Sequence, residues 1–63
     1  MVEEAGNVYV EWEMFEPAAC CYLKIKMWEK AGMYFEKAEK YIDAISAYKD
    51  GGLYKILINF LKR

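Results

Sequence analysis

Few side chains in this 63-residue chain could carry out acid–base or nucleophilic chemistry. It has no histidine, no glycine-rich phosphate loop, no Cys-x-x-Cys pair and no Gly-x-Ser-x-Gly turn. General-base catalysis would depend on Asp, Glu or Lys in a shaped pocket. One carboxylate pair, Glu11 and Glu13, is two residues apart and points to different faces of a helix. We therefore expect no catalytic residue and no enzymatic activity.

The adjacent cysteines Cys20 and Cys21 are the remaining candidates for chemistry. A vicinal pair could respond to redox conditions or bind a soft metal. On a helix, however, neighbouring side chains point about 100° apart, which disfavours both a ring disulfide and shared metal ligation. We expect ordinary packing, no metal ligand and no cofactor, while a reactive thiol at Cys20 stays open as an alternative.

Aromatic residues recur every thirteen residues, and this spacing divides the chain into repeated structural elements. The series is Phe15, Trp28, Tyr41 and Tyr54. Three residues after each comes Ala18, Ala31, Ala44 or Leu57, and seven after it comes Tyr22, Phe35, Tyr48 or Leu61. Aromatic residues are 17% of the chain, so four at one phase is on the order of a one-in-a-thousand coincidence. Such a repeat is typical of stacked arrays that bind rather than catalyse.

The apolar positions within each thirteen-residue unit lie on one face of a helix. They fall at positions 0, 3, 4 and 7, counted from the aromatic residue. The sequence predicts an all-α fold of about five short antiparallel helices stacked as a solenoid, at residues 2–11, 15–25, 28–38, 41–50 and 54–62. Helices this short need stacking to persist. Residues 8–15 also alternate like a strand, so the first boundary is the least defined.

Proline and glycine agree with these boundaries. Pro17 falls in the first turn of the second predicted helix, where its missing N–H has little effect. Gly51 and Gly52 follow the fourth, where we expect them to supply the left-handed cap and turn. Small residues such as Ala31 and Gly32 predict a notch that a neighbouring helix can approach closely.

These residues resemble the tetratricopeptide helix–turn–helix pattern. The match lies at Trp28, Ala31, Gly32, Phe35, Tyr41, Ala44 and Tyr48. It departs from the family at Ala31, where Leu is usual, at Gly51, where Ala is usual, and in lacking a closing proline. Each unit is also shortened. The segments AACCYLKIKMWEKAG and KAEKYIDAISAYKDGGLY are similar to the compact tetratricopeptide-like solenoids of intraflagellar-transport and vesicle-coat scaffolds.

The resemblance implies a groove lined by the first helix of each pair. The residues that it assigns to this partner-binding face are Lys26, Glu29, Met33, Glu36, Lys55 and Asn59. Lys55 and Asn59 match part of the family's clamp for a peptide carboxylate, but the Asn and basic residues of following repeats are lacking. Solvated polar positions are the alternative for all six residues.

Composition limits the partners and the setting. Net charge is −1, which gives no strong attraction to nucleic acid. No apolar run approaches the roughly 18 residues that a membrane-spanning helix needs. Two adjacent cysteines do not form a secreted disulfide framework, so an intracellular, cytoplasmic location is expected. The 57% hydrophobic content suggests one helical-repeat segment over residues 1–63, cut from a longer protein whose neighbouring repeats cover it.

The last predicted helix suggests self-association, since it concentrates apolar residues at Leu57, Ile58, Phe60 and Leu61. Residues 1–16 carry a charge of −5 and residues 17–63 a charge of +4, so head-to-tail assembly is one arrangement. A two-fold pairing of last helices is the other. The sequence slightly favours the two-fold pairing, because apolar burial contributes more than screened surface charge.

The sequence therefore predicts a non-catalytic scaffold segment that binds a protein or peptide partner. One alternative is a structural spacer that contacts only neighbouring repeats. A second is a redox-responsive or metal-responsive module that uses Cys20 and Cys21. An exposed Met33 among mixed charges would favour binding over the spacer, and an electropositive, exposed cysteine pair would favour the second alternative.

Overall fold

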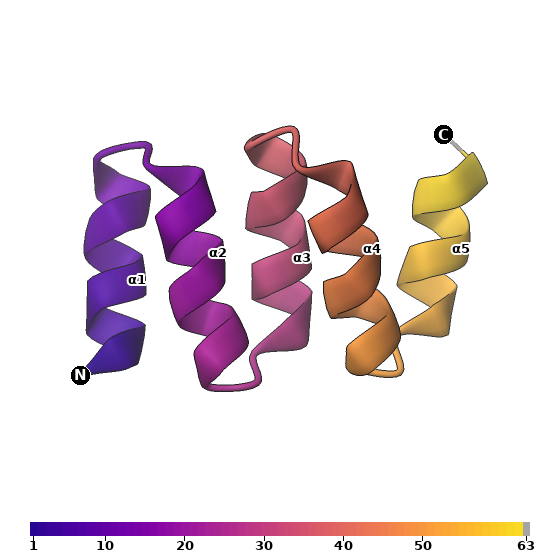
Figure 1. Cartoon of the computed structure of the whole chain (residues 1–63), viewed down its shortest axis with the longest axis horizontal. Coiled ribbons are helices and arrows are strands. Elements are labelled where there is room, and N and C mark those ends of the chain that lie inside the picture. The colour runs from indigo at the N-terminus through magenta and orange to yellow at the C-terminus, as the bar shows by residue number, and fades with distance from the viewer. Residues whose placement is uncertain (63) are drawn as a thin grey trace.

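The computed structural model describes residues 1–62 and shows five short helices in a row (Figure 1). They are α1 (Val2–Glu11), α2 (Phe15–Lys24), α3 (Trp28–Lys37), α4 (Tyr41–Asp50) and α5 (Tyr54–Lys62). The all-α prediction is confirmed, and no strand occurs in residues 1–62. Every predicted boundary agrees with the observed one to within a residue. The first helix keeps its expected bounds despite the strand-like alternation of residues 8–15.

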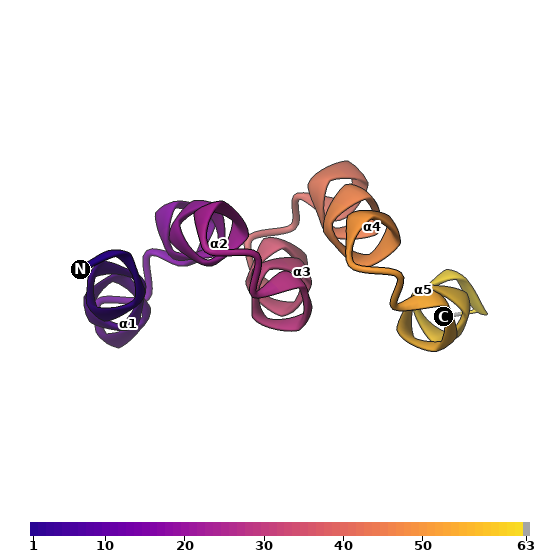
Figure 2. The same cartoon turned by 90° about the horizontal axis from the view of Figure 1, so that it is seen from below.

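Consecutive helices run antiparallel and alternate between two layers. The chain reverses at each turn, so α1, α3 and α5 run in one direction and α2 and α4 in the other (Figure 1). Seen along the helices, α1, α3 and α5 form one layer, here called the odd layer, and α2 and α4 form the even layer (Figure 2). Each helix packs on its neighbours in sequence, which is the arrangement of a helical repeat.

Three-residue turns join all five helices, and they share one backbone geometry. The residue with positive φ falls at the same place in each turn: Glu13, Lys26, Glu39 and Gly52, with φ between 58° and 68°. The N–H of Glu13 donates to the carbonyl of Val10 at 2.9 Å, and that of Met14 to Tyr9 at 2.8 Å. The other turns repeat both bonds. This pair of bonds is the Schellman motif, which satisfies carbonyl groups at the helix end.

The expected role of the glycine pair needs a correction. Gly52 is left-handed, but Gly51 has a φ of −84° and lies in the right-handed region. Three of the four left-handed positions carry Glu or Lys, whose Cβ makes this conformation costly. The hydrogen bonds of the turn hold these residues there.

Glycine at the three strained positions should stabilise the protein. The left-handed conformation costs a non-glycine residue about 1–2 kcal/mol, and glycine adds about 0.5–1 kcal/mol of unfolded-chain entropy. We expect Glu13→Gly, Lys26→Gly and Glu39→Gly each to raise the free energy of unfolding by about 0.5–1 kcal/mol. Gly52→Ala is the reverse control and should lower it by a similar amount. Urea denaturation measures all four, and a loss of stability in the three glycine variants would contradict the shared turn geometry.

The core is built from small residues and three rings. Its buried members are Ala18, Ala19, Tyr22, Ala31, Phe35, Ala44, Ala47 and Tyr48. The alanines let the helix axes approach, and the rings fill the remaining space. Rings approach a neighbouring helix closely at Gly6 and Gly32. A Cβ on Gly6 would lie 3.0 Å from the Tyr22 ring, and one on Gly32 would lie 2.4 Å from the Tyr48 ring.

Side-chain packing repeats at every second thirteen-residue unit rather than at each one. Tyr22 lies on Gly6, and two units later Tyr48 lies on Gly32. Tyr34 of α3 stacks on Phe15 and Tyr22 of α2, with ring centroids 5.8 and 5.6 Å apart. Phe60 of α5 lies beside the equivalent residues Tyr41 and Tyr48 of α4, with ring centroids 6.0 and 6.4 Å apart and the rings tilted rather than stacked. A helix pair, one helix from each layer, is therefore the structural repeat.

Candidate interaction surfaces

The strongest sequence candidates lie along one stripe of α3. Glu29, Met33 and Glu36 are four and three residues apart, which places them on one face of the helix. Met33 is 39% exposed and Glu29 is exposed. Glu36 is half-buried and accepts a hydrogen bond from the Tyr48 hydroxyl, so it also joins α3 to α4. The stripe thus presents one flexible apolar side chain between two carboxylates.

Lys55 and Asn59 form the corresponding stripe of α5. Both are exposed and four residues apart. Figure 2 places α5 in the same layer as α3. Lys55 and Asn59 occupy the positions within α5 that Glu29 and Met33 occupy within α3, so the repeat turns both stripes to the same side of that layer. Lys26 is not on either stripe. It occupies the strained position of the turn between α2 and α3, with a φ of 61°.

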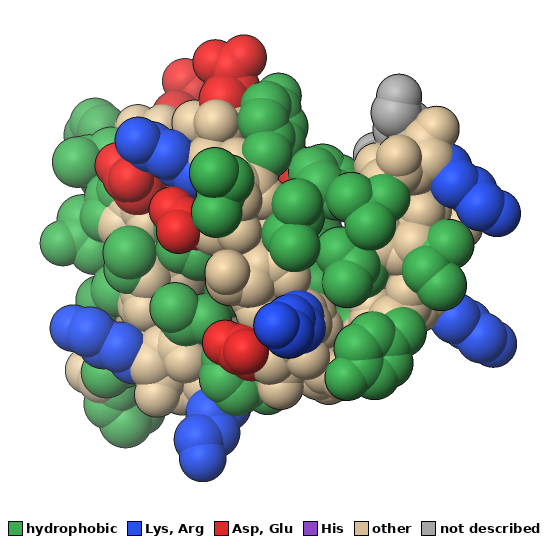
Figure 3. Space-filling model, turned by 45° about the vertical axis from the view of Figure 1, so that its right-hand side comes forward, with side chains coloured by type: hydrophobic (Ala, Val, Ile, Leu, Met, Phe, Trp, Pro, Cys, Tyr) green, Lys and Arg blue, Asp and Glu red, His purple; other side chains and the backbone are tan. Residues whose placement is uncertain are grey.

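The four predicted self-association residues divide between two sides of α5. Leu57 packs against the core, and the Phe60 ring lies beside Tyr41 and Tyr48, so both serve the contact with α4. Ile58 and Leu61 are 51% and 62% exposed. No residue of α5 is fully buried. Figure 3 shows hydrophobic side chains along a hollow between α5 and the rest of the molecule, with basic side chains at the outer edge of α5.

A second exposed apolar surface, on α1, was not among the predicted sites. Val8 is 52% exposed and Trp12, directly after α1, is 75% exposed. Glu4 and Glu11 are exposed at the same helix face. Trp12 does not belong to the 0, 3, 4, 7 pattern, and that mismatch was the available signal in the sequence.

The cysteines are free thiols, and the surroundings of Cys20 do not activate it. Cys20 is exposed and Cys21 is half-buried, with no disulfide between them. Desolvation raises the pKa of the Cys20 thiol, and the negative charges of Glu16 and Asp43 raise it further. A raised pKa lowers the fraction of thiolate, the nucleophilic and metal-binding form. Within residues 1–62 no three Cys, Asp or Glu side chains form a group that could hold a metal ion.

Some charged side chains link neighbouring helices. Lys40 Nζ lies 3.6 Å from a Glu16 carboxylate oxygen, which links the start of α4 to α2. Lys30 lies over the Tyr22 ring, and Lys37 lies over Phe15 and Tyr34, each about 5.4–5.5 Å from the ring centroid. The ion pair is about half exposed and contributes at most about 1 kcal/mol. These contacts help to orient α2, α3 and α4.

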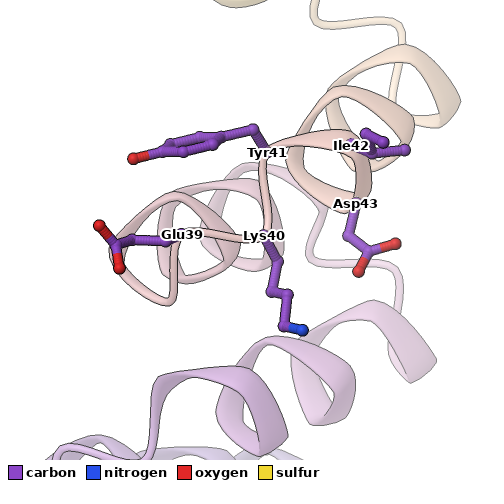
Figure 4. A pocket seen from close by; sticks show the side chains of 5 residues that line it. All are labelled: Glu39, Lys40, Tyr41, Ile42 and Asp43. Carbon is purple, nitrogen blue, oxygen red and sulfur yellow. The ribbon is translucent and has the colours of Figure 1, made fainter.

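Three surface hollows occur at equivalent places and do not form a ligand site. They lie at the first turns of three helices, lined by residues 27–30 with Leu53, residues 39–43, and residues 52–56. In the hollow at α4, the Asp43 side chain points away from those of Glu39 and Tyr41 (Figure 4). A small-molecule site needs polar groups that converge. The hollows therefore follow from the repeated turn.

Two further observations bear on the identity of the chain. None of the described helices has the length and apolarity needed to cross a membrane. Comparison with models of protein families, with curated proteins and with solved structures finds no match to this chain.

Proposed function

We propose that this chain is a non-catalytic, tetratricopeptide-like interaction segment that binds a protein or peptide on its odd layer. The observation that carries the proposal is the exposure of Met33, which lies between Glu29 and the half-buried Glu36 on a helix held by packing. A spacer that contacts only its own repeats has no need of a flexible apolar side chain at this place. Methionine adapts to varied partners because its thioether chain is flexible and polarizable.

The repeated packing supports the tetratricopeptide-like assignment. In both helix pairs a glycine of the odd-layer helix receives a tyrosine of the following helix, Gly6 with Tyr22 and Gly32 with Tyr48. One pair follows the other after two thirteen-residue units, with three-residue turns, which agrees with the compact solenoids that the sequence resembles. Unpaired cysteines accord with an intracellular location for such a scaffold.

The charge of the odd layer specifies the partner. Glu29 on α3 favours a basic group, and Lys55 on α5 favours an acidic one. A large apolar side chain between them would bury Met33, which contributes about 1.5–3 kcal/mol for a fully buried side chain. The partner is thus a short segment with an apolar anchor flanked by opposite charges. Asn59 adds a donor and an acceptor for its backbone.

Selection of random peptides on the immobilised chain tests this proposal. We expect peptides with an apolar anchor, and we expect Met33→Glu to weaken their binding about tenfold or more, since about 1.4 kcal/mol of lost burial corresponds to tenfold. Ile42→Glu is the matched control, because Ile42 is also exposed but lies on the even layer. It should leave binding unchanged. Peptides that bind Met33→Glu as tightly as the unchanged chain would favour the structural spacer instead.

A further inference from the structure

An uncovered apolar stripe runs along α5, on a side that α4 does not use. Tyr54, Ile58 and Leu61 are four and three residues apart and are 51–62% exposed. Two units earlier the same positions of α3 are Trp28, Gly32 and Phe35: Gly32 receives Tyr48 of α4, Trp28 meets Gly51 directly after α4, and Phe35 is buried in the core. The stripe is thus the face that carries a neighbouring helix elsewhere in this molecule.

A helix of the α4 kind does not fit this stripe. On α3 the Tyr48 ring lies so close to Gly32 that a Cβ there would come within 2.4 Å of it. The equivalent position of α5 is Ile58, which fills that space with a branched side chain. The helix that covers α5 must therefore pack in another way. Lys55 and Lys62 flank the stripe and favour an acidic helix.

The exposed face of α1 has the matching pattern. With about 100° per residue, Lys55 and Lys62 lie about 40–60° to one side of Ile58, and Tyr54 and Leu61 lie as far to the other side. On α1, Ala5 and Trp12 lie to the first side of Val8, and Glu4 and Glu11 lie to the other. When two helices pack side by side in the same direction, the side of α5 that carries the lysines meets the side of α1 that carries the glutamates. The apolar side of α5 then meets the apolar side of α1. A parallel pair therefore sets Lys against Glu and apolar against apolar.

The spacing along the two helices also agrees. Lys55 and Lys62 are seven residues apart, as are Glu4 and Glu11. Two pairs, Lys55 with Glu4 and Lys62 with Glu11, can therefore form in one register. That register brings Ile58 to within one residue of Val8. The helices α1 and α5 already run in the same direction within one molecule (Figure 1). A second copy displaced along the row of helices meets α5 in the required orientation.

We propose that copies of this chain assemble head to tail, with α1 of one copy covering the α5 stripe of the next. This surface shares Lys55 with the proposed peptide site but does not include Met33 or any other residue of α3, so it does not rest on the Met33 stripe. Antiparallel pairing of two α5 helices about a two-fold axis sets Lys55 of one copy near Lys62 of the other, because an antiparallel pair matches like sides. With Leu57 and Phe60 packed towards α4, both arrangements bury the same exposed residues of α5, namely Tyr54, Ile58 and Leu61. Charge then decides the arrangement.

Variants blocked at one end distinguish the two arrangements. Val8→Lys with Trp12→Lys blocks α1, and Ile58→Glu with Leu61→Glu blocks α5; all four residues are exposed, and circular dichroism checks that each variant stays helical. In sedimentation equilibrium we expect the average mass of the assemblies of the unchanged chain to rise with concentration, because a head-to-tail interface does not close. Each blocked variant alone should be a monomer of 7.4 kDa. Their mixture should stop at a dimer, since one α1 face and one α5 face remain intact.

A charge exchange tests the pairs themselves. Lys55→Glu with Lys62→Glu should weaken assembly several-fold, and adding Glu4→Lys with Glu11→Lys to the same chain should restore it. Ile42→Glu is the control that should change nothing. Added salt should weaken the unchanged assembly, because screening acts on exposed charges. Dimers of the α1-blocked variant alone would overturn the proposal in favour of two-fold pairing, and a monomeric unchanged chain at every concentration would overturn both.

Discussion

Replacement of Tyr48 by alanine should leave the chain largely unfolded at room temperature. Tyr48 is 2% exposed, lies on Gly32 of α3 and borders the Phe60 ring of α5. Truncation of a buried aromatic residue to alanine costs about 3–5 kcal/mol. A core in a chain this small rarely supplies more than about 3–5 kcal/mol in total. One substitution therefore removes most of the stability, because a single ring serves three helices.

Urea denaturation followed by circular dichroism measures this effect, with two control variants. Tyr48→Phe keeps the ring and loses only the hydrogen bond to Glu36, so we expect a cost of about 1–2 kcal/mol. Tyr54→Ala removes the same side chain from a 60% exposed position and should cost no more than about 1 kcal/mol. Equal losses for Tyr54→Ala and Tyr48→Ala would show that the buried face has been assigned wrongly.

The contact between Gly51 and Trp28 should give the second-largest effect. A Cβ at Gly51 would lie 2.3 Å from Trp28 Cβ. Because the Cβ of Trp28 is bonded directly to the backbone of α3, it cannot move away without a shift of that helix. Two units earlier the same two positions carry Ile25 and Val2, a larger and a smaller residue. We expect Gly51→Ile alone to cost about 3 kcal/mol through overpacking. We expect Trp28→Val alone to cost about 2 kcal/mol, since Trp28 is half-buried.

The double variant carries the residues of the first helix pair in the second. It should lose about 2 kcal/mol less than the two single variants together, because the space left by Trp28 admits the isoleucine. Trp28→Val with Gly52→Ala is the matched control: a Cβ at Gly52 meets nothing within 4 Å, so these two effects should add. Additive effects for Trp28 and Gly51 would mean that the two residues do not touch.

The helices themselves follow from the sequence because their signal is local. Apolar residues at positions 0, 3, 4 and 7 define one face of a helix, and thirteen residues leave space for a ten-residue helix and a three-residue turn. The left-handed turn residue was predicted only where glycine marks it, at Gly52. At Glu13, Lys26 and Glu39 no residue type signals the conformation. It arises from hydrogen bonds that close each helix end, and the same short connection imposes it four times.

The partner of each side chain is decided by the tertiary structure. Tyr22 and Phe35 share position 7 of their units, and nothing in the thirteen-residue repeat separates them. Antiparallel stacking places successive helices in alternate layers, so an environment recurs only at every second helix. The packing period is therefore two units of the sequence repeat. For the same reason the apolar sequence of α5 predicts self-association but does not show which face of the helix is exposed. Packing on α4 engages Leu57 and Phe60 and leaves Ile58 and Leu61 exposed.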